Sequence, residues 1–242
     1  MMSIENQPIM YYVMNQIKKC QNVKIIVATS TSIKDDSIEN YIKKLNFKVF
    51  RGNENDVLDR YYQCAKKESD EIFVRISADS PLIDHEIITE CINKFKKNNF
   101  DYFSNTIKKV NNVWIEHFNG FPIGYAVEIF RFSALERAWK ESFEPSDREH
   151  VTEYIWKHPQ IFKLGNFENK NDYSNYRLVI DYPNDFKLIK EIIKNFPENT
   201  IFSLNSIVKF LEKNPKMAVP VKGFFPPSHG AIVPLSPKIS QR

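Results

Sequence analysis

The stretch EIFVRISADSPLID, residues 71–84, decides the fold because it joins an apolar run to an isolated acid. Residues 72–76 predict a buried strand, and the chain then passes through small residues to Asp79 and Pro81. A carboxylate at the end of an apolar strand is costly to bury without a partner. Asp79 therefore either caps a turn, which is common for Asp before Ser-Pro, or binds a ligand at the carboxyl end of a strand. The stretch alone leaves both interpretations open.

The composition is that of a globular protein and excludes several classes of partner. The 242 residues, 42% hydrophobic and 26% charged, suffice for one large domain or two small ones. The net charge is +4, with lysines dispersed among acids, so we expect no nucleic-acid partner. No apolar run approaches the ~20 residues of a membrane span, so we expect no membrane partner.

The cysteines and the first residues favour a cytoplasmic protein. Cys20, Cys64 and Cys91 lie far apart in apolar segments, which predicts buried, reduced thiols rather than disulfides or a zinc site. The opening MMSIENQPIM lacks the basic start and small-residue cleavage site of a signal peptide. The expected location is therefore the cytoplasm.

Apolar runs alternate with amphipathic stretches through the first 100 residues. The continuous β-branched run VKIIVAT (23–29) predicts a central strand. Strand–helix alternation at this spacing predicts right-handed crossovers and a mostly parallel sheet covered on both faces, which is an α/β fold. Around this strand and the one at 72–76, the pattern predicts a strand at 47–50 and helices at 8–20, 36–45, 55–67 and 85–97.

After residue 100 the pattern changes. Strands are predicted at 101–106 and 124–130, separated by a polar, Asn-rich insertion at 107–120. A capping box of Ser146 and Glu149 predicts a helix from 146 to 157. The pattern also predicts a strand at 177–186 and helices at 133–141, 184–196 and 203–213. We expect one domain, residues 1–214, followed by an extended or disordered proline-rich tail at 215–242.

Two acids share one structural situation. Asp79 and Asp181 each end a predicted strand and are each followed within two residues by proline. Strand ends at one edge of a sheet face a common crevice, and two carboxylates with open water positions suit Mg²⁺ in phosphate chemistry. Two independent turn acids remain the alternative.

Five segments in order carry a family resemblance: FRGNENDVLDRYYQCAKK (50–67), VRISADSPLID (74–84), GYAVEIFRFSALERAWKE (124–141), REHVTEYI (148–155) and RLVIDYPNDFKLI (177–189). Together they closely resemble the cytidylyltransferase-like family of surface-polysaccharide synthesis, which includes the spore-coat polysaccharide protein F group. The synthetases of CMP-KDO and CMP-sialic acids are more distant members. The resemblance implies a nucleotide-diphospho-sugar transferase-like sandwich. The implied reaction joins CTP to the anomeric hydroxyl of a nonulosonic-acid-like sugar, releasing pyrophosphate and a CMP-sugar.

The resemblance also implies roles for particular residues. Asp79 and Asp181 match the catalytic acids that bind Mg²⁺. A second group matches the residues lying against the nucleotide: Thr29, Ser30, Arg51, Gly52, Asn53, Asp56 and Arg75. A third falls where the sugar would lie: Glu128, Arg148, Glu149 and His150.

Two of these residues have a structural alternative. An arginine on a strand, such as Arg75, more often pairs with a core acid than with a phosphate. A single histidine on an apolar helical face, such as His150, is more often a hydrogen-bonded core residue. The polar neighbours Arg148 and Glu149 favour a site, since three consecutive polar side chains cannot all face the core.

The sequence departs from the family pattern at its start. The family begins with an apolar strand and a phosphate-binding loop, roughly G-S-x-R-L-P-G-K, and neither precedes Met1-Met2 here. A late start codon or a gene fragment would explain this. We therefore expect a sheet that lacks its first strand, with a hole that exposes the strands at 23–29 and 74–78, and weak binding of CTP.

Three functions follow as hypotheses. The first is a cytidylyltransferase with CTP and a sugar as substrates, inactive in this form if the loop is essential. The second is a non-catalytic binding protein of the same fold, and the third a glycosyltransferase. Ser80-Pro81 after Asp79 counts against the D-x-D motif of the third. A homodimer is compatible with the resemblance, because dimers are common among the related synthetases.

Overall fold

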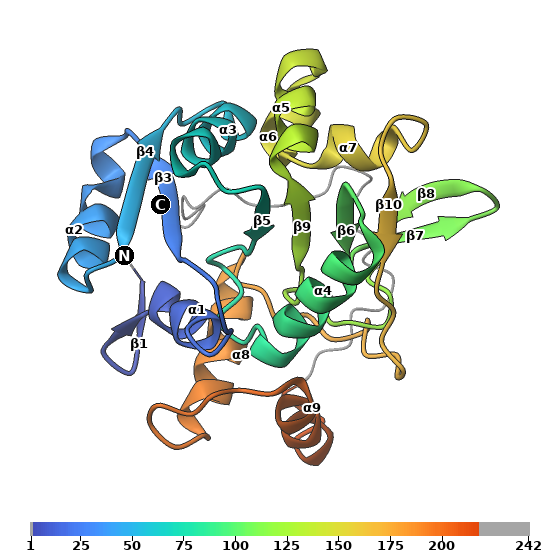
Figure 1. The fold of residues 1–242 in the computed structure, drawn as a ribbon. Helices are drawn as coiled ribbons and strands as arrows, with labels where there is room; N and C mark the ends of the chain where they lie inside the picture. The colour runs from blue at the N-terminus through green and yellow to red at the C-terminus, as the bar shows by residue number, and fades with distance from the viewer. Residues whose placement is uncertain (1, 218–242) are drawn as a thin grey trace.

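The computed structural model describes residues 2–217, which form two main β-sheets with helices on both faces (Figure 1). Four strands pair in the order β10-β6-β9-β5, and β3 pairs with β4 in parallel. Within the larger sheet only β9 runs against its neighbours. The strands are β3 (Ile26–Ser30), β4 (Lys48–Gly52), β5 (Ile72–Arg75), β6 (Tyr102–Ser104), β9 (Glu128–Arg131) and β10 (Leu164–Asn166).

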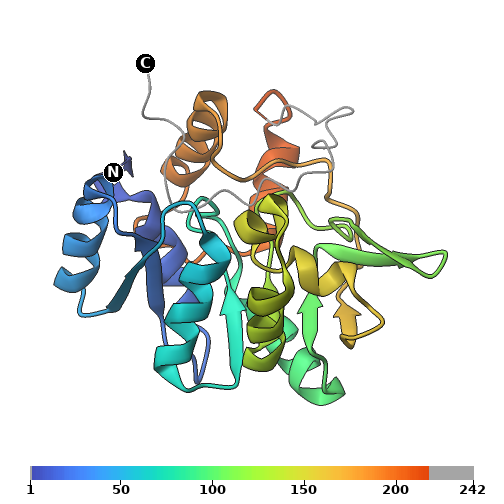
Figure 2. The same ribbon diagram turned by 90° about the horizontal axis from the view of Figure 1, so that it is seen from above.

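Side-chain alternation along the strands builds two apolar clusters, one on each face of the larger sheet. Phe103 and Ile129 face one cluster, whereas their neighbours Tyr102 and Phe130 face the other. The first cluster is covered by α1 (Ile9–Ile17), α4 (His85–Asn98), α8 (Pro183–Lys194) and α9 (Leu204–Lys213). The second is covered mainly by α3 (Val57–Glu68), α5 (Phe132–Glu141) and α7 (Glu153–Lys157), which follows α6 (Pro145–His150) (Figure 2).

Smaller elements complete the described chain. The hairpin of β1 (Ser3–Ile4) and β2 (Gln7–Pro8) precedes α1, and η1 (Ile33–Asp35) leads into α2 (Asp36–Lys44). Asp79 and the segment up to α4 form the loop that follows β5. Helix α2 packs beside the β3–β4 pair through buried Ile42, together with α1. The predicted helices at 8–20, 36–45, 55–67, 85–97, 133–141, 184–196 and 203–213 are therefore confirmed to within a few residues at either end.

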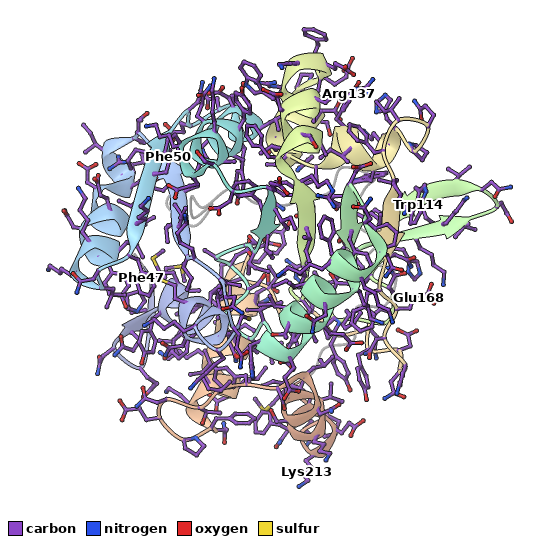
Figure 3. The ribbon with its side chains drawn as sticks, in the orientation of Figure 1. Phe47, Phe50, Trp114, Arg137, Glu168 and Lys213 are labelled. Carbon is purple, nitrogen blue, oxygen red and sulfur yellow. The ribbon has the colours of Figure 1, made fainter. Side chains whose placement is uncertain are left out.

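The Asn-rich insertion is a projecting hairpin of β7 (Ile107–Val110) and β8 (Val113–Glu116) (Figures 1 and 2). Its turn residues Asn111 and Asn112 have φ values of 48° and 65°, which suit a two-residue hairpin turn. Trp114, which pairs with Lys109 one position from the turn, packs against the second cluster and anchors the hairpin to the domain (Figure 3).

Two predicted elements are wrong. The helix at 146–157 is broken into α6 and α7 at Val151, whose φ is +65°, and Ser146 hydrogen-bonds Glu153 instead of capping a helix. The strand at 177–186 is a turn segment with one bridge, Ile123 to Arg177. The predicted tail at 215–242 lies almost wholly outside the described residues.

The two main sheets are not joined. β3 and β5 are the edge strands that face each other, and no ladder connects them within residues 2–217 (Figure 1). This agrees with the expected gap beside the strands at 23–29 and 74–78.

Two further sequence expectations concern thiols and membranes. Cys20 and Cys91 are buried, Cys64 is half-buried, and all three thiols are free. Burial raises the pKa of the Cys64 thiol to about 11. Over residues 2–217, no helix is long and apolar enough to cross a membrane.

Candidate active site

The loop after β5 brings Asp79 next to the segment that carries Asp181. The backbone N–H of Ile180 donates to the carbonyl oxygen of Asp79 at 2.9 Å. Burial raises the pKa of Asp79 to about 6; hydroxyls of Ser77 and Ser80 oppose this shift, and the negative charge of Asp181 adds to it. Two acids separated by 102 positions in sequence (181 − 79) therefore meet at the carboxyl end of β5.

Asp181 keeps one oxygen unused. Its Oδ2 accepts a hydrogen bond from Arg177, whereas its Oδ1 is buried and has no partner among the described residues. A buried carboxylate oxygen without a donor is costly and marks a place where a cation or a water is needed. The Asp79 carboxylate accepts from the Ser80 hydroxyl at 3.0 Å and is close enough to Asp181 for the charge of that acid to raise its pKa. This donor set fits a hard divalent cation, although the described chain holds no group of three or more acids, histidines or cysteines arranged for a metal.

Arg177 and Asp185, neither of them predicted as site residues, hold Asp181 in place. Asp185 accepts from the Arg177 guanidinium at 2.9 and 3.0 Å and from the backbone N–H groups of Asp181 and Tyr182 at 3.0 Å. Asp185 therefore caps α8 and fixes the turn before it. The sequence analysis missed this cluster, although the spacing of Arg177, Asp181 and Asp185, four residues apart, was a signal that could have found it.

The predicted nucleotide and sugar residues Arg75 and Glu128 form a buried ion pair. They stand opposite each other in the β5–β9 ladder and are 5% and 2% exposed. Glu128 also accepts hydrogen bonds from Tyr102, at 3.1 Å, and Thr152. Arg75 therefore pairs with a core acid, as the structural alternative to phosphate binding predicts. Its Nε is nevertheless buried and has no partner among the described residues.

His150 lies beside this pair because of a tight turn. Val151 has φ +65° and ψ −54°, and Thr152 N–H donates to the carbonyl oxygen of His150 at 2.7 Å, which is a three-residue γ-turn. The turn ends α6 with His150 and directs Thr152 to Glu128. His150 is buried with Nδ1 unpartnered among the described residues, and burial lowers its pKa. Glu149 is exposed.

At the ends of β3 and β4 the predicted nucleotide residues are held by acids of η1 and α2. Thr29 and Ser30 hydroxyls both donate to Asp35 Oδ2 at 2.7 Å. Arg51 pairs with Glu39 and Asp36 and donates to the carbonyl oxygens of Ser30 and Ser32. Asp35 was not predicted.

The loop after β4 connects to α6. Asn53 caps a turn by accepting from the N–H groups of Asn55 and Asp56. Asp56 caps α3 and binds the Arg148 guanidinium with both oxygens, at 2.5 to 3.1 Å. At Gly52 an added Cβ would lie 2.8 Å from the Arg60 side chain, so a glycine lets that buried arginine cross the strand end.

The structure therefore gathers the predicted residues into three neighbouring groups rather than one. Asp79 and Asp181 form the first, Arg75, Glu128 and His150 the second, and the ends of β3 and β4 with Arg148 the third. The positive charge of Arg75 weakly opposes the rise in the pKa of Asp79, so the first two groups are in electrostatic contact.

Comparison with known proteins gives consistent results. A family model described as cytidylyltransferase matches residues 1–213. An uncharacterised protein of Methanocaldococcus jannaschii is 36% identical over 220 residues, which are 90% of this chain and 85% of that protein. The spore coat polysaccharide biosynthesis protein SpsF of Bacillus subtilis is 27% identical over 197 residues, 80% of this chain and 77% of that one.

Solved structures agree. A cytidylyltransferase of Leptospira borgpetersenii superposes with a TM-score of 0.80 at 28% identity, covering 90% of this chain and 88% of that one. A CMP:2-keto-3-deoxy-manno-octonic acid synthetase complexed with CTP shares the fold, with a TM-score of 0.61 at 13% identity, over 80% of this chain and 90% of its own. The match over residues 1–213 decides the assignment, and the chain belongs to the cytidylyltransferase family.

Proposed function

We propose that this chain transfers the cytidylyl group of CTP to the anomeric hydroxyl of a nonulosonic-acid-like sugar. The observation that carries the proposal is the meeting of Asp79 and Asp181, with the buried Asp181 Oδ1 left without a donor. In a family of cytidylyltransferases, such an acid pair at the carboxyl end of a strand suits a triphosphate bound with a cation.

The proposed cofactor is one Mg²⁺ held by Asp79 and Asp181. Mg²⁺ commonly binds through one or two carboxylates, keeps several waters, and takes further oxygens from substrate phosphates. When bound, it would neutralise charge on the phosphates. The Asp79 carboxyl, with a pKa of about 6, is ionised at neutral pH and ready to bind the cation. Arg177 and Asp185 keep the Asp181 carboxylate from rotating away.

The bond changes of the proposed reaction balance without a covalent enzyme intermediate. The sugar hydroxyl oxygen bonds to the α-phosphorus of CTP, and the bond from that phosphorus to the bridging oxygen breaks. Pyrophosphate leaves, and the hydroxyl proton passes to solvent. The requirements on the protein are alignment and stabilisation of negative charge, and acid-bound cations with nearby arginines meet them.

The sugar class rests on two relatives and on the residues that the family resemblance places on the sugar side. SpsF is named for spore coat polysaccharide biosynthesis, and the synthetase of similar fold for a keto-deoxy sugar acid. The proposed sugar side is the region of Glu128, Arg148, Glu149 and His150. His150 Nδ1 has no partner within the described residues and supplies a polar contact for a sugar hydroxyl.

One observation favours the second candidate, a non-catalytic binding protein. Arg51, Arg75 and Arg148 each already pair with an acid. A catalytic triphosphate site needs donors that are not committed elsewhere. The experiment below separates the two candidates.

The test compares residues 1–242 with Asp79→Asn and Asp181→Asn, using Asp70→Asn as a matched control. Asp70 precedes β5 at its opposite end and forms a surface ion pair with Lys24. The readouts are pyrophosphate release at millimolar CTP with a panel of sugar acids, and Mn²⁺ binding by electron paramagnetic resonance. We expect the two site variants to lose both signals at least tenfold and the control to keep them.

The outcomes test the metal site and distinguish the two candidate functions. Undiminished release or Mn²⁺ binding in Asp79→Asn would remove that acid from the metal site. Mn²⁺ binding without release from any sugar acid would support the non-catalytic candidate. A circular-dichroism melt of each variant shows that the fold is intact.

A further inference from the structure

Arg60, which was not predicted as a site residue, is a buried cation at the carboxyl ends of β3 and β4. It belongs to the first turn of α3, just after the loop that follows β4, and is 2% exposed. Its side chain crosses the end of β4 at Gly52, where an added Cβ would lie 2.8 Å from the Arg60 Cγ. Ser30 and Gly52 end the two parallel strands side by side, so Arg60 lies at the sheet edge where α/β folds bind ligands.

No acid of the described chain pairs with Arg60. Within residues 2–217 its only side-chain hydrogen bonds run from Nη1 to the carbonyl oxygens of Asn53, at 2.6 Å, and Glu54, at 3.5 Å. Its Nε is buried and has no acceptor among these residues. Residues 218–242 contain no Asp or Glu, so they supply no acidic side chain that could balance the charge.

The acids near Arg60 are committed to other groups. Asp35 accepts from the hydroxyls at the end of β3, and Asp56 binds the Arg148 guanidinium with both oxygens. Burial lowers the pKa of Arg60, the positive charge of Arg75 adds to this shift, and Asp35 and Asp56 oppose it only in part. The protonated guanidinium is therefore held at a cost in this structure.

Binding of the loop accounts for only one nitrogen of this side chain. Nη1 holds the backbone after β4, which is a structural role. Carbonyl oxygens are neutral, however, and a guanidinium stays protonated in proteins, so the buried charge remains without a counter-charge. A buried Nε without an acceptor adds a further cost. Both observations call for an anion at this place.

We propose that Arg60 binds a phosphate group of a nucleotide at the carboxyl ends of β3 and β4. Phosphate oxygens are anionic, so they form charge-assisted hydrogen bonds with a guanidinium that are stronger than those of neutral carbonyls. The inference rests on the proposed function for the nucleotide as the source of the phosphate. The contact itself requires neither the acid pair nor turnover.

The arrangement suits a polyphosphate better than a single carboxylate. The charge of Arg75 acts on both Arg60 and Asp79, so the cation and the acid pair lie within reach of the same group. A polyphosphate can bind an arginine through one phosphate and an acid-bound cation through another. The carboxylate of a sugar acid is too small to do both.

The first experiment observes the Nε–H group of Arg60 directly. It uses ¹H–¹⁵N NMR of the full chain at low salt, without sugar or divalent cations, and Arg60→Lys identifies the signal by its loss. Inorganic pyrophosphate and CTP should both shift this signal. Cytidine, which has no phosphate, and acetate, which offers a carboxylate, should leave it in place.

A matched pair of variants measures the contribution to affinity. Arg60→Met and Lys66→Met each remove one cation from α3, but Lys66 is exposed and lies toward the other end of the helix. Titration calorimetry with pyrophosphate should show at least tenfold weaker binding by Arg60→Met and less than twofold by Lys66→Met. Cytidine should bind equally to the unchanged chain and to both variants. If a circular-dichroism melt shows that Arg60→Met does not fold, the NMR signal of the unchanged chain decides.

Three results would overturn the proposal. These are an Nε signal that does not move with pyrophosphate or CTP, an equal shift with cytidine or acetate, and an equal loss of affinity in Lys66→Met. An unchanged KM for CTP in an active Arg60→Met chain would also reject the contact while leaving the proposed function intact. Conversely, Arg60-dependent binding of pyrophosphate by a chain that turns over no sugar acid would uphold the contact and reject the proposed function.

Discussion

The buried pair of Arg75 and Glu128 shows how a residue can look like a site residue and yet stabilise the core. Both side chains are almost fully enclosed, and Glu128 takes two further donors from Tyr102 and Thr152. The carboxylate therefore has an ion pair and a hydrogen-bond network, which burial of a charge demands. The buried Nε of Arg75 has no partner among the described residues and remains for a ligand.

We expect Arg75→Met to destabilise the fold by about 3–5 kcal/mol, because it leaves Glu128 charged, buried and without its cation. The double variant Arg75→Met, Glu128→Leu should recover at least half of that loss, since it removes both charges and leaves only two hydroxyls without an acceptor. Urea unfolding at neutral pH measures both. A double variant no more stable than Arg75→Met would show that the loss does not come from the uncompensated charge of Glu128.

A second prediction concerns how the ionisation of Asp79 makes the stability of the fold depend on pH in the absence of divalent cations. Its pKa lies near 6 in the folded state against an ordinary 3.8, so the folded chain binds the proton more tightly. The stabilisation from that proton is complete below about 3.8 and is lost as the pH rises to about 6. Above this window the ionised carboxyl opposes folding.

We therefore expect Asp79→Asn to be more stable than the unchanged chain at pH 7.5 and equal to it at pH 3.5. Added Mg²⁺ should narrow the difference at pH 7.5, because a cation stabilises the ionised acid. Urea melts across the pH range give the difference directly. A difference that does not change with pH would mean that Asp79 is not buried in its charged form.

Local sequence pattern predicted most of the helices. It did not predict elements whose conformation depends on contacts with residues distant in sequence. The helices α1 to α5, α8 and α9 have clear apolar periodicity. The hairpin β7–β8 was hidden in a polar insertion, although its Asn-Asn turn and flanking alternation were a usable signal. The break at Val151 has no such signal, because a β-branched residue there is held by burial and by the contact of Thr152 with Glu128.

The segment at 177–186 does not form a strand because the chain at Gly124 approaches its backbone closely. Gly124 has φ +103°, and its α-carbon packs against the backbone of Leu178. This close approach allows one bridge between Ile123 and Arg177 and then turns the chain toward Asp181. Sequence pattern showed an apolar run at 177–181 and could not show which backbone would lie against it.

We expect Gly124→Ala to destabilise the fold by about 3 kcal/mol, since alanine is strained at this φ and its Cβ would lie 2.5 Å from the Leu178 carbonyl oxygen. The displaced segment should also weaken Mn²⁺ binding. Gly165→Ala is the control, because its Cβ would meet only the outer ring of Phe100, which can move, and no site acid is near in sequence. Equal losses of metal binding in both variants would contradict the role given to Gly124.

Across the molecule, the two acids of the site lie together, whereas the arginines of the site are already paired with other acids of the chain. The acid pair is in place because β5 and the turn before α8 meet, as the backbone hydrogen bond between Ile180 and Asp79 shows. Each arginine that the sequence predicted at the site is paired with an acid of this chain. The sheet is also divided between β3 and β5, so the strand ends that should share one crevice belong to two sheets.

We therefore expect residues 1–242 to bind CTP weakly, with a dissociation constant in the millimolar range. A triphosphate needs donors to balance its charge, and recruiting Arg51 or Arg148 would first break their ion pairs. Each charge-assisted hydrogen bond that is not formed costs about 1.5–3 kcal/mol, so the absence of two or three lowers affinity by orders of magnitude.

Titration calorimetry with CTP and Mg²⁺ tests this, with Asp36→Asn as a comparison. That variant releases one partner of Arg51 at the surface and keeps Glu39, so the guanidinium becomes more available without leaving the fold. Tighter CTP binding by Asp36→Asn would show that engaged arginines limit affinity. Micromolar binding by the unchanged chain would instead mean that Asp79, Asp181 and the donors already in place suffice for a triphosphate.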